Sequence, residues 1–258
     1  MPKANTVKLY KKTLTNEFFN FNAIAFIPPE PIKTTAVFTH GYTASKTDCV
    51  NWAQRLSDAN IPTIIFDLPG HHLGSFNSVA SFEVFKSHSY KCFLTAFNYL
   101  HELSPGAERL VLGGHSLGAL LSVFALDIPE FQNLNPLAIG VGLGIGQHKT
   151  AHLFETSFYE KTLNIRRQLV DEKIDSDLVF PWIKEAKLSL DQTGRRIHLI
   201  TGQDDVVVGE GGMEALAFQL SSNGNEVTTA EPRKLPHHEP AAAATHIYNF
   251  LKKELSLN

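Results

Sequence analysis

Short apolar runs alternate with longer amphipathic stretches along most of the chain, and this pattern predicts the order of strands and helices. Helical periodicity is expected at residues 82–103, 116–126 and 241–255. Three strands at the start, followed by alternation of strands and helices, predict an α/β fold. Its sheet is mostly parallel and eight-stranded, with helices on both faces and an antiparallel edge. The predicted strands are 7–14, 22–27, 34–39, 62–66, 109–113, 137–143, 196–201 and 225–230.

The interval 146–191 interrupts this alternation, because it lies between two predicted core strands and has the amphipathic pattern of helices. A structureless loop of this length is uncommon inside a compact domain. We therefore predict a single domain over residues 1–258, with 146–191 inserted into it as a helical cap. The apolar residues of the cap are Phe154, Phe158, Tyr159, Leu163, Ile165, Leu169, Phe180, Trp182 and Ile183.

The composition excludes several classes of protein. Apolar residues make up 43% of the 258, which is enough for a substantial core. A net charge of −3 and the absence of basic clusters argue against a partner that is a nucleic acid. No apolar run reaches the roughly 18 residues of a membrane span, and no secretory signal follows the N-terminus. We expect a cytoplasmic protein without stable membrane insertion; its oligomeric state is left open.

A serine flanked by glycines follows the predicted strand at 109–113. The segment is Gly114-His115-Ser116-Leu117-Gly118, and an apolar helical pattern begins directly after it. Small flanking residues allow a sharp turn from strand to helix that exposes the serine hydroxyl. Amides at the start of the helix favour negative charge that develops beside them. The alternative is an ordinary glycine turn with a serine cap, but the strand and helix on either side favour a nucleophile.

Four further segments have recognisable motifs. Residues 38–46 read Phe-Thr-His-Gly-Tyr-Thr-Ala-Ser-Lys, and 67–75 read Asp-Leu-Pro-Gly-His-His-Leu-Gly-Ser. Residues 197–207 end in Gly-Gln-Asp-Asp-Val-Val, and 235–240 read Leu-Pro-His-His-Glu-Pro. With these motifs the sequence resembles the α/β-hydrolase family over nearly its whole length, in particular the esterase and monoacylglycerol-lipase-like branch. The resemblance implies the α/β-hydrolase fold and a serine hydrolase that needs no metal or organic cofactor.

By this resemblance, residues 38–46 form the loop that holds the oxyanion. The backbone amides of Tyr42 and Leu117 are the expected donors. Gly41 suits the loop independently, because a glycine lets the backbone approach a ligand closely. The expected contacts to substrate are made by His40, Gly41, His115 and Trp182.

The acid and the base of the implied triad each have two candidates. The family places its acid at the third position after the turn glycine, which favours Asp205 over its neighbour Asp204. The His-x-Pro pattern favours His238 as the base, with His237 as the runner-up. The order Ser, Asp, His along the chain is the one that this fold uses.

The loop at 67–75 departs from the family pattern, because it has extra residues before Gly74. Its pair His71-His72 could suggest a metal, but no carboxylate or cysteine follows at a suitable spacing. We expect the pair to be solvated or to lie at the rim of a pocket, with no metal bound.

The motifs together predict a serine hydrolase that cleaves a small or medium carboxylic ester through an acyl-enzyme on Ser116. The aromatic cap motivates this substrate class, since it would provide an apolar wall. The alternative is that the cap aromatics only pack against the core. Thioester, amide or C–C bond hydrolysis by the same triad also remains open, as does a non-catalytic binding protein on this fold.

Overall fold

A computed structural model describes residues 6–146, 162 and 164–256 of the chain. Its centre is an eight-stranded sheet with the order β1-β2-β4-β3-β5-β6-β7-β8. The hairpin β1-β2 is antiparallel and joins β4 in antiparallel fashion, and all remaining neighbours are parallel. The predicted sheet is therefore confirmed. The strands are β1 (Lys8–Thr15), β2 (Asn20–Ile27), β3 (Thr34–Thr39), β4 (Thr63–Phe66), β5 (Arg109–His115), β6 (Leu137–Val141), β7 (Arg196–Ile200) and β8 (Glu226–Ala230).

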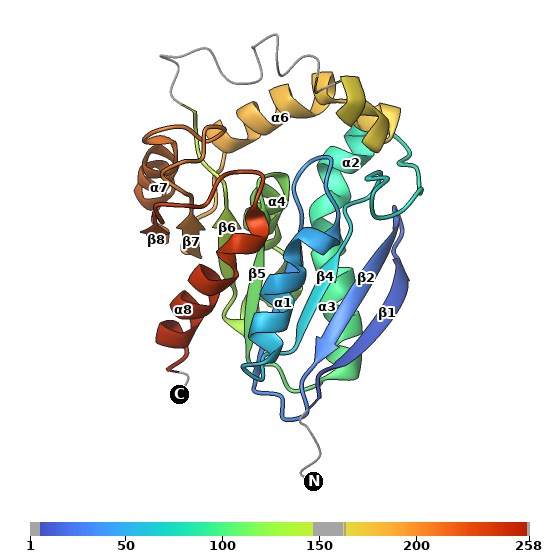
Figure 1. Ribbon diagram of the computed structural model, residues 1–258, viewed down its shortest axis with the longest axis vertical. Coiled ribbons are helices and arrows are strands. Elements are labelled where there is room, and N and C mark those ends of the chain that lie inside the picture. The colour runs from blue at the N-terminus through green and yellow to red at the C-terminus, as the bar shows by residue number, and fades with distance from the viewer. Residues whose placement is uncertain (1–5, 147–161, 163, 257–258) are drawn as a thin grey trace.

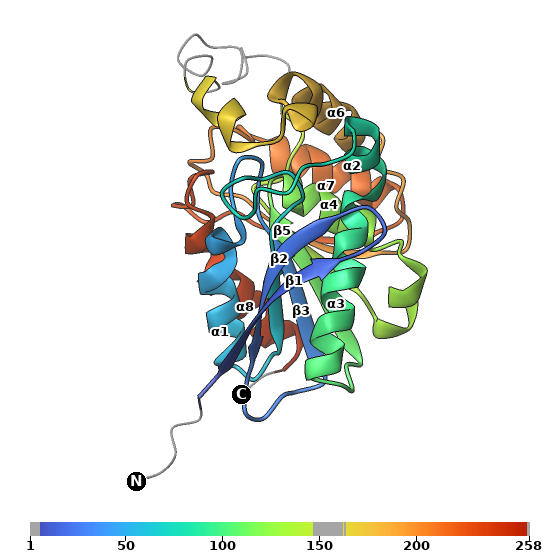
Figure 2. The ribbon, with the colours of Figure 1, turned by 90° about the vertical axis from the view of Figure 1, so that its right-hand side faces the viewer.

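Helices cover both faces of this sheet, as Figure 2 shows. On one face, α1 (Val50–Ser57) packs beside α8 (Ala244–Glu254). On the other face lie α3 (Cys92–Leu103), α4 (Leu117–Ala125) and α7 (Gly212–Ser222). Strands β3 to β6 are almost entirely buried, because a parallel sheet covered on both faces needs apolar side chains on both.

The helices differ from the predicted pattern in two respects. Two helices, α1 and α7, were not predicted. The long helix expected at 82–103 is divided into α2 (Phe82–His88) and α3 by a 3-10 turn.

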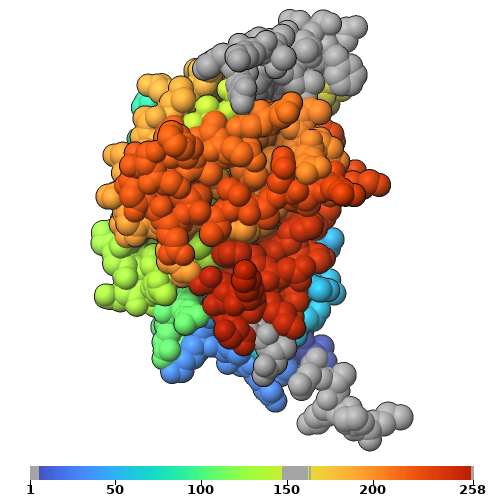
Figure 3. All heavy atoms as spheres, turned by 90° about the vertical axis from the view of Figure 1, so that its left-hand side faces the viewer, coloured from blue at the N-terminus to red at the C-terminus, as the bar shows by residue number. Residues whose placement is uncertain are grey.

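Strand β8 forms one edge of the sheet, and on that side of the molecule the C-terminal part of the chain makes up most of the surface (Figure 3). The 3-10 helices are η1 (Lys46–Cys49), η2 (Ser89–Lys91), η3 (Pro129–Leu134), η5 (Arg167–Leu169), η6 (Glu172–Ile174) and η7 (Pro240–Ala243).

The described part of the predicted cap lies across the carboxyl ends of the parallel strands (Figure 1). It contains η5, η6 and α6 (Ser176–Leu188). The loop after β4 holds it from below, since Asp171 donates its amide to the carbonyl of Gly70 at 2.8 Å and His71 pairs with Val170. The expected cap residues Phe154, Phe158, Tyr159 and Leu163 lie outside the described residues. Within the described ranges, no helix has the length and apolarity that a membrane span needs.

Two glycines allow α4 to begin directly above the sheet. A Cβ atom on Gly114 would lie 2.5 Å from the carbonyl carbon of Gly118, and one on Gly118 would lie 2.6 Å from the carbonyl oxygen of His40. Both contacts are with backbone, which has little freedom to move. The turn between β5 and α4 therefore depends on hydrogen in place of a side chain at these positions.

We expect Gly118→Ala to lower the free energy of unfolding by about 1–3 kcal/mol, because the added methyl group overlaps backbone atoms. The matched control is Gly140→Ala on β6, where the nearest atom to an added Cβ is the Cδ2 of Leu199 at 3.2 Å. That side chain can move aside, so the control should lose about 1 kcal/mol or less. Urea denaturation measures both, and equal losses would contradict this account.

Candidate active site

Ser116 lies at the sharp turn between β5 and α4, in a backbone conformation that few side chains adopt. Its φ is 50° and its ψ is −109°. Such a conformation costs about 1–3 kcal/mol and persists only where the surroundings enforce it. Its amide donates to the carbonyl of Val141 at 2.8 Å, and its carbonyl accepts from Leu120 at 3.1 Å. The strained serine is therefore held from both sides at the carboxyl edge of the sheet.

The loop after β3 passes close to this serine. A Cβ atom on Gly41 would lie 3.4 Å from the Cβ of Ser116 and 2.6 Å from the Nδ1 of His115. Only a glycine fits here without a shift of the neighbours. The next residue, Tyr42, donates its hydroxyl to the carbonyl of Ile174 at 2.9 Å. The loop thus reaches the serine through its backbone and the cap through its tyrosine side chain.

His40 is completely buried and both of its ring nitrogens bind backbone groups. Nδ1 lies 2.8 Å from the carbonyl of Gly41, and Nε2 accepts from the amide of Leu68 at 2.9 Å. These partners place the proton on Nδ1. Burial lowers the pKa of His40 to about 4, and nearby Lys46 also lowers it. The expectation that His40 contacts substrate is wrong, because the ring has no free nitrogen and no exposed surface.

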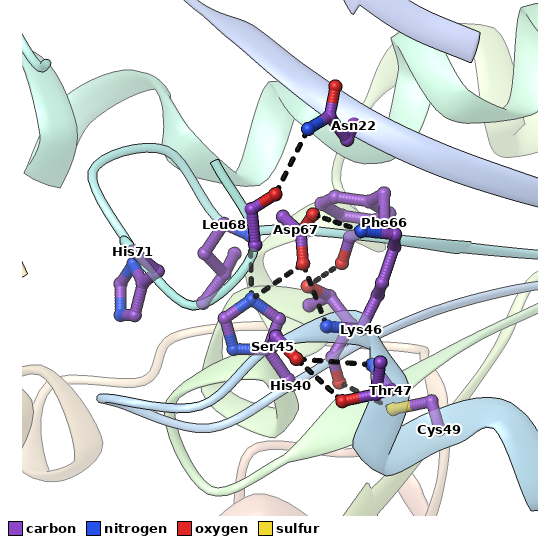
Figure 4. A network of polar contacts seen from close by, with 12 residues as sticks. Asn22, His40, Ser45, Lys46, Thr47, Cys49, Phe66, Asp67, Leu68 and His71 are labelled. Carbon is purple, nitrogen blue, oxygen red and sulfur yellow. Dashed lines mark hydrogen bonds and ion pairs between the residues drawn. The ribbon is translucent and has the colours of Figure 1, made fainter. Parts of the chain in front are cut away.

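The carboxylate of Asp67, the first residue after β4, joins the loop after β4 to the loop after β3 (Figure 4). Oδ1 accepts from the amide of Lys46 at 2.8 Å, and Oδ2 pairs with the Nζ of Lys46 at 2.5 Å. The carboxylate is fully buried, whereas the side chain of Lys46 is 13% exposed. Gly74 covers it so closely that a Cβ would lie 2.0 Å from the Cγ of Asp67. This pair fixes the loop at 40–46 against the loop at 67–75.

The structure pairs Asp205 with His237 beyond the carboxyl ends of the strands. Nδ1 of His237 lies 2.8 Å from Oδ2 of Asp205. The other oxygen accepts from the amides of Val207 at 3.0 Å and Val208 at 2.9 Å, which fixes the orientation of the carboxylate. Only 4% of Asp205 is exposed.

The preference for His238 over His237 as the partner of the acid is wrong. Successive residues of a turn point in different directions, and in this turn the ring of His237 points toward Asp205. Asp204 turns away from both, since its Oδ1 accepts from the amide of Leu235 at 2.8 Å. It caps the loop that precedes the histidines.

Strand β6 brings the serine and the histidine to the same place. Val141, its last residue, accepts the amide of Ser116, as described above. The next residue, Gly142, has a φ of 64°, and a Cβ on it would lie 3.1 Å from the Nδ1 and Cε1 of His237. Ser116 and His237 therefore flank consecutive residues, although they are far apart in sequence.

His115, which precedes the serine, packs against the ring of His237. The ring centroids are 4.6 Å apart and the ring planes are inclined at 54°. His115 is 7% exposed. Burial is the main reason that its pKa lies well below the ordinary value, and the neighbouring His237 and His40 contribute.

His71, the first histidine of the pair His71-His72, does not lie at the surface as expected. His71 is fully buried, with Nδ1 3.0 Å from the carbonyl of Pro69, and burial lowers its pKa to about 3. Its ring contacts those of Tyr42 and Phe85. The interpretation of His71 as solvated or at a pocket rim is therefore wrong. Within the described ranges, no group of three or more His, Cys, Asp and Glu residues could hold a metal ion.

Trp182 lies on α6 and packs edge-on against Phe82 and Phe85 of α2, with ring centroids 6.0 Å and 6.2 Å away. Phe180 makes a similar contact with Tyr42, at 5.2 Å. These aromatic residues therefore attach the described part of the cap to α2 and to the loop after β3. The contacts described for these residues are packing contacts, which is the alternative that the sequence left open for the cap aromatics.

The comparisons with known proteins agree with this architecture. A sequence model of the α/β hydrolase family matches residues 36–144, and no curated protein sequence matches the chain significantly. An esterase from Pyrobaculum calidifontis superposes with a TM-score of 0.70 at 12% identity, over 97% of this chain and 86% of its own. The 2-hydroxy-6-oxo-6-phenylhexa-2,4-dienoate hydrolase from Rhodococcus sp. strain RHA1 gives 0.65 at 15% identity, over 97% and 100%.

An acylaminoacyl peptidase from Pyrococcus horikoshii gives a TM-score of 0.64 at 13% identity. The match covers 98% of this chain but only 42% of the peptidase chain. At these identities the likeness concerns the fold alone.

We expect Lys46→Met to lower the free energy of unfolding by about 3–5 kcal/mol, because it leaves the buried carboxylate of Asp67 without its cation. The matched control is Lys33→Met, which removes a lysine from the exposed ion pair with Glu108. Such exposed pairs contribute about 1 kcal/mol or less. Urea denaturation at neutral pH measures both variants. A loss for Lys46→Met no larger than that of the control would contradict the role given to this pair.

Proposed function

Since this chain has the α/β-hydrolase fold and a model of that family matches its residues 36–144, we propose that it is a serine hydrolase of carboxylic esters. The observation that supports the proposal is that a strained serine and a histidine bound to a buried aspartate lie against consecutive residues at the end of β6. Esterases among the similar structures are consistent with it. The substrate class is a small or medium carboxylic ester.

In this mechanism Ser116 attacks the carbonyl carbon of the ester while His237 takes the proton of its hydroxyl through Nε2. Asp205 holds the proton of the histidine on Nδ1 and stabilises the imidazolium that forms. The carboxylate is suited to this, because both of its oxygens are already fixed by hydrogen bonds.

The negative charge of the tetrahedral intermediate is stabilised by the backbone amides of Tyr42 and Leu117. Leu117 is the first residue of α4, where helix amides favour an anion. Tyr42 follows the close approach of Gly41 to Ser116. On collapse of the intermediate the protonated His237 gives its proton to the leaving alcohol, and water activated by the now neutral histidine then cleaves the acyl-enzyme. Gly41 and Trp182 are the proposed contacts for the substrate.

We expect Ser116→Ala to abolish covalent labelling by a fluorophosphonate and to lower kcat for p-nitrophenyl acetate by roughly 10⁶-fold. His237→Gln should have a similar effect on kcat, because it removes the base. His238→Gln is its matched control and should keep at least about a tenth of the activity. Labelling of the Ser116→Ala protein would contradict the choice of nucleophile. Loss of activity in His238→Gln alone would contradict the choice of base.

Rates on p-nitrophenyl esters of increasing acyl length test the substrate class. We expect kcat/KM to rise from acetate to a medium chain, by about tenfold for every two methylene groups that enter an apolar site, and then to fall. A flat profile would contradict an apolar acyl site. Thioester and amide analogues of the best ester separate the alternative reactions. A wild-type protein that neither labels nor hydrolyses any of them would favour a binding protein.

A further inference from the structure

His115 occupies a closed space beside the candidate base. The ring lies between the glycines that follow two strands, where a Cβ on Gly41 would be 2.6 Å from Nδ1 and one on Gly142 would be 3.2 Å from Cδ2. The same Cβ on Gly142 would lie 3.1 Å from the ring of His237. The two imidazoles therefore both border the space that Gly142 leaves open.

Both ring nitrogens of His115 are buried, and their one polar approach among the described residues, to the backbone of His237, lies outside the geometry of a full hydrogen bond. A buried polar atom without a partner normally destabilises the folded state. An alkyl or phenyl side chain of similar size would avoid this cost. The presence of an imidazole here therefore calls for a role other than stability.

The ionisable groups that act on His115 are His40 after β3 and His237 with His238 after β8. Asp205, after β7, binds His237. His115 does not compete with His237 for the acid, because Asp205 already uses both oxygens. Burial keeps His115 neutral at ordinary pH. A neutral ring with an electron-rich face therefore lies against the ring of His237.

We propose that His115 is a positioning residue for His237, and that its neutral imidazole supports that ring and stabilises its protonated form. The inference rests on the proposed function only in taking His237 as the base. Contact of a cation with an electron-rich ring is attractive, and more so where water is excluded. An aliphatic side chain fills the same space without this attraction. The charged histidine, which in the proposed reaction forms as Ser116 loses its proton, is the state that gains most.

The direct test follows the protonation of His237 by NMR in protein labelled with ¹⁵N-histidine, with His237→Gln to assign the signal. In His115→Leu and His115→Met the pH midpoint of His237 should fall by about 0.5–1 unit, because its charged form loses a favourable neighbour. His115→Gln, which restores a neutral polar group, should recover most of the shift. Methionine adapts to irregular space, so it serves if the leucine variant fails to fold.

The matched control is His198→Leu. His198 is also a largely buried histidine stacked on a ring, that of Phe250 at 3.7 Å, and burial lowers its pKa to about 4. It lies on β7, and the side-chain contacts described for it are with Thr228 and Phe250. Its replacement should leave the midpoint of His237 unchanged, even where it lowers the thermal stability of the protein.

If esters are substrates, the acid limb of the pH profile of kcat/KM in His115→Leu should move to lower pH by the same amount as the midpoint of His237. Its kcat should fall while KM stays the same. An unchanged or raised midpoint of His237 in both aliphatic variants would overturn the inference. Because the NMR titration needs no turnover, it separates failure of this inference from failure of the proposed function, which the fluorophosphonate tests independently.

Discussion

The candidate site depends on one steric constraint: three backbone segments meet where β5 turns into α4, with no room for side chains between them. Gly114 and Gly118 lie within van der Waals contact of each other and of the end of β3. This close packing holds Ser116 in a conformation that its own side chain disfavours. A looser turn would let the serine relax into the helix, and its hydroxyl would lose its fixed place above the sheet.

A second layer of interactions holds the loops around this turn. The buried pair of Asp67 with Lys46 joins the loop after β3 to the loop after β4, and His40 lies between them with both nitrogens bound to backbone. Charges and polar groups that are buried in this way stabilise one arrangement only if all of them are satisfied. The position of Gly41 near Ser116 is thus set by groups that never touch a substrate.

Polar groups that the structure leaves without partners have a different meaning. The ring nitrogens of His115 are buried and, in the part of the chain that the structure describes, make no full hydrogen bond, beside the histidine that is the candidate base. For stability alone, an apolar ring of similar size would serve as well as this imidazole. Its contact with His237 connects the nucleophile motif to the base through side-chain packing as well as through the sheet.

The sequence by itself determined the sheet, the position of the serine and the loops that surround it. Apolar runs and glycine motifs carry that information locally, because each strand or turn is specified by adjacent residues. Helices α1 and α7 were not predicted, because both begin within loops whose motifs obscure the helical pattern of apolar residues. The division of residues 82–103 between α2 and α3 was likewise invisible in a continuous helical periodicity.

Only the tertiary structure decided between adjacent candidates. His237 and His238 have the same chemistry and differ by one position, so the choice depends on which ring the turn directs toward Asp205, a residue that lies on another loop. The burial of His71 and the pairing of Asp67 with Lys46 were also beyond the sequence, because both depend on segments distant along the chain. Local patterns fix the backbone at each strand end, whereas the direction of each side chain there is set by neighbours that only folding brings together.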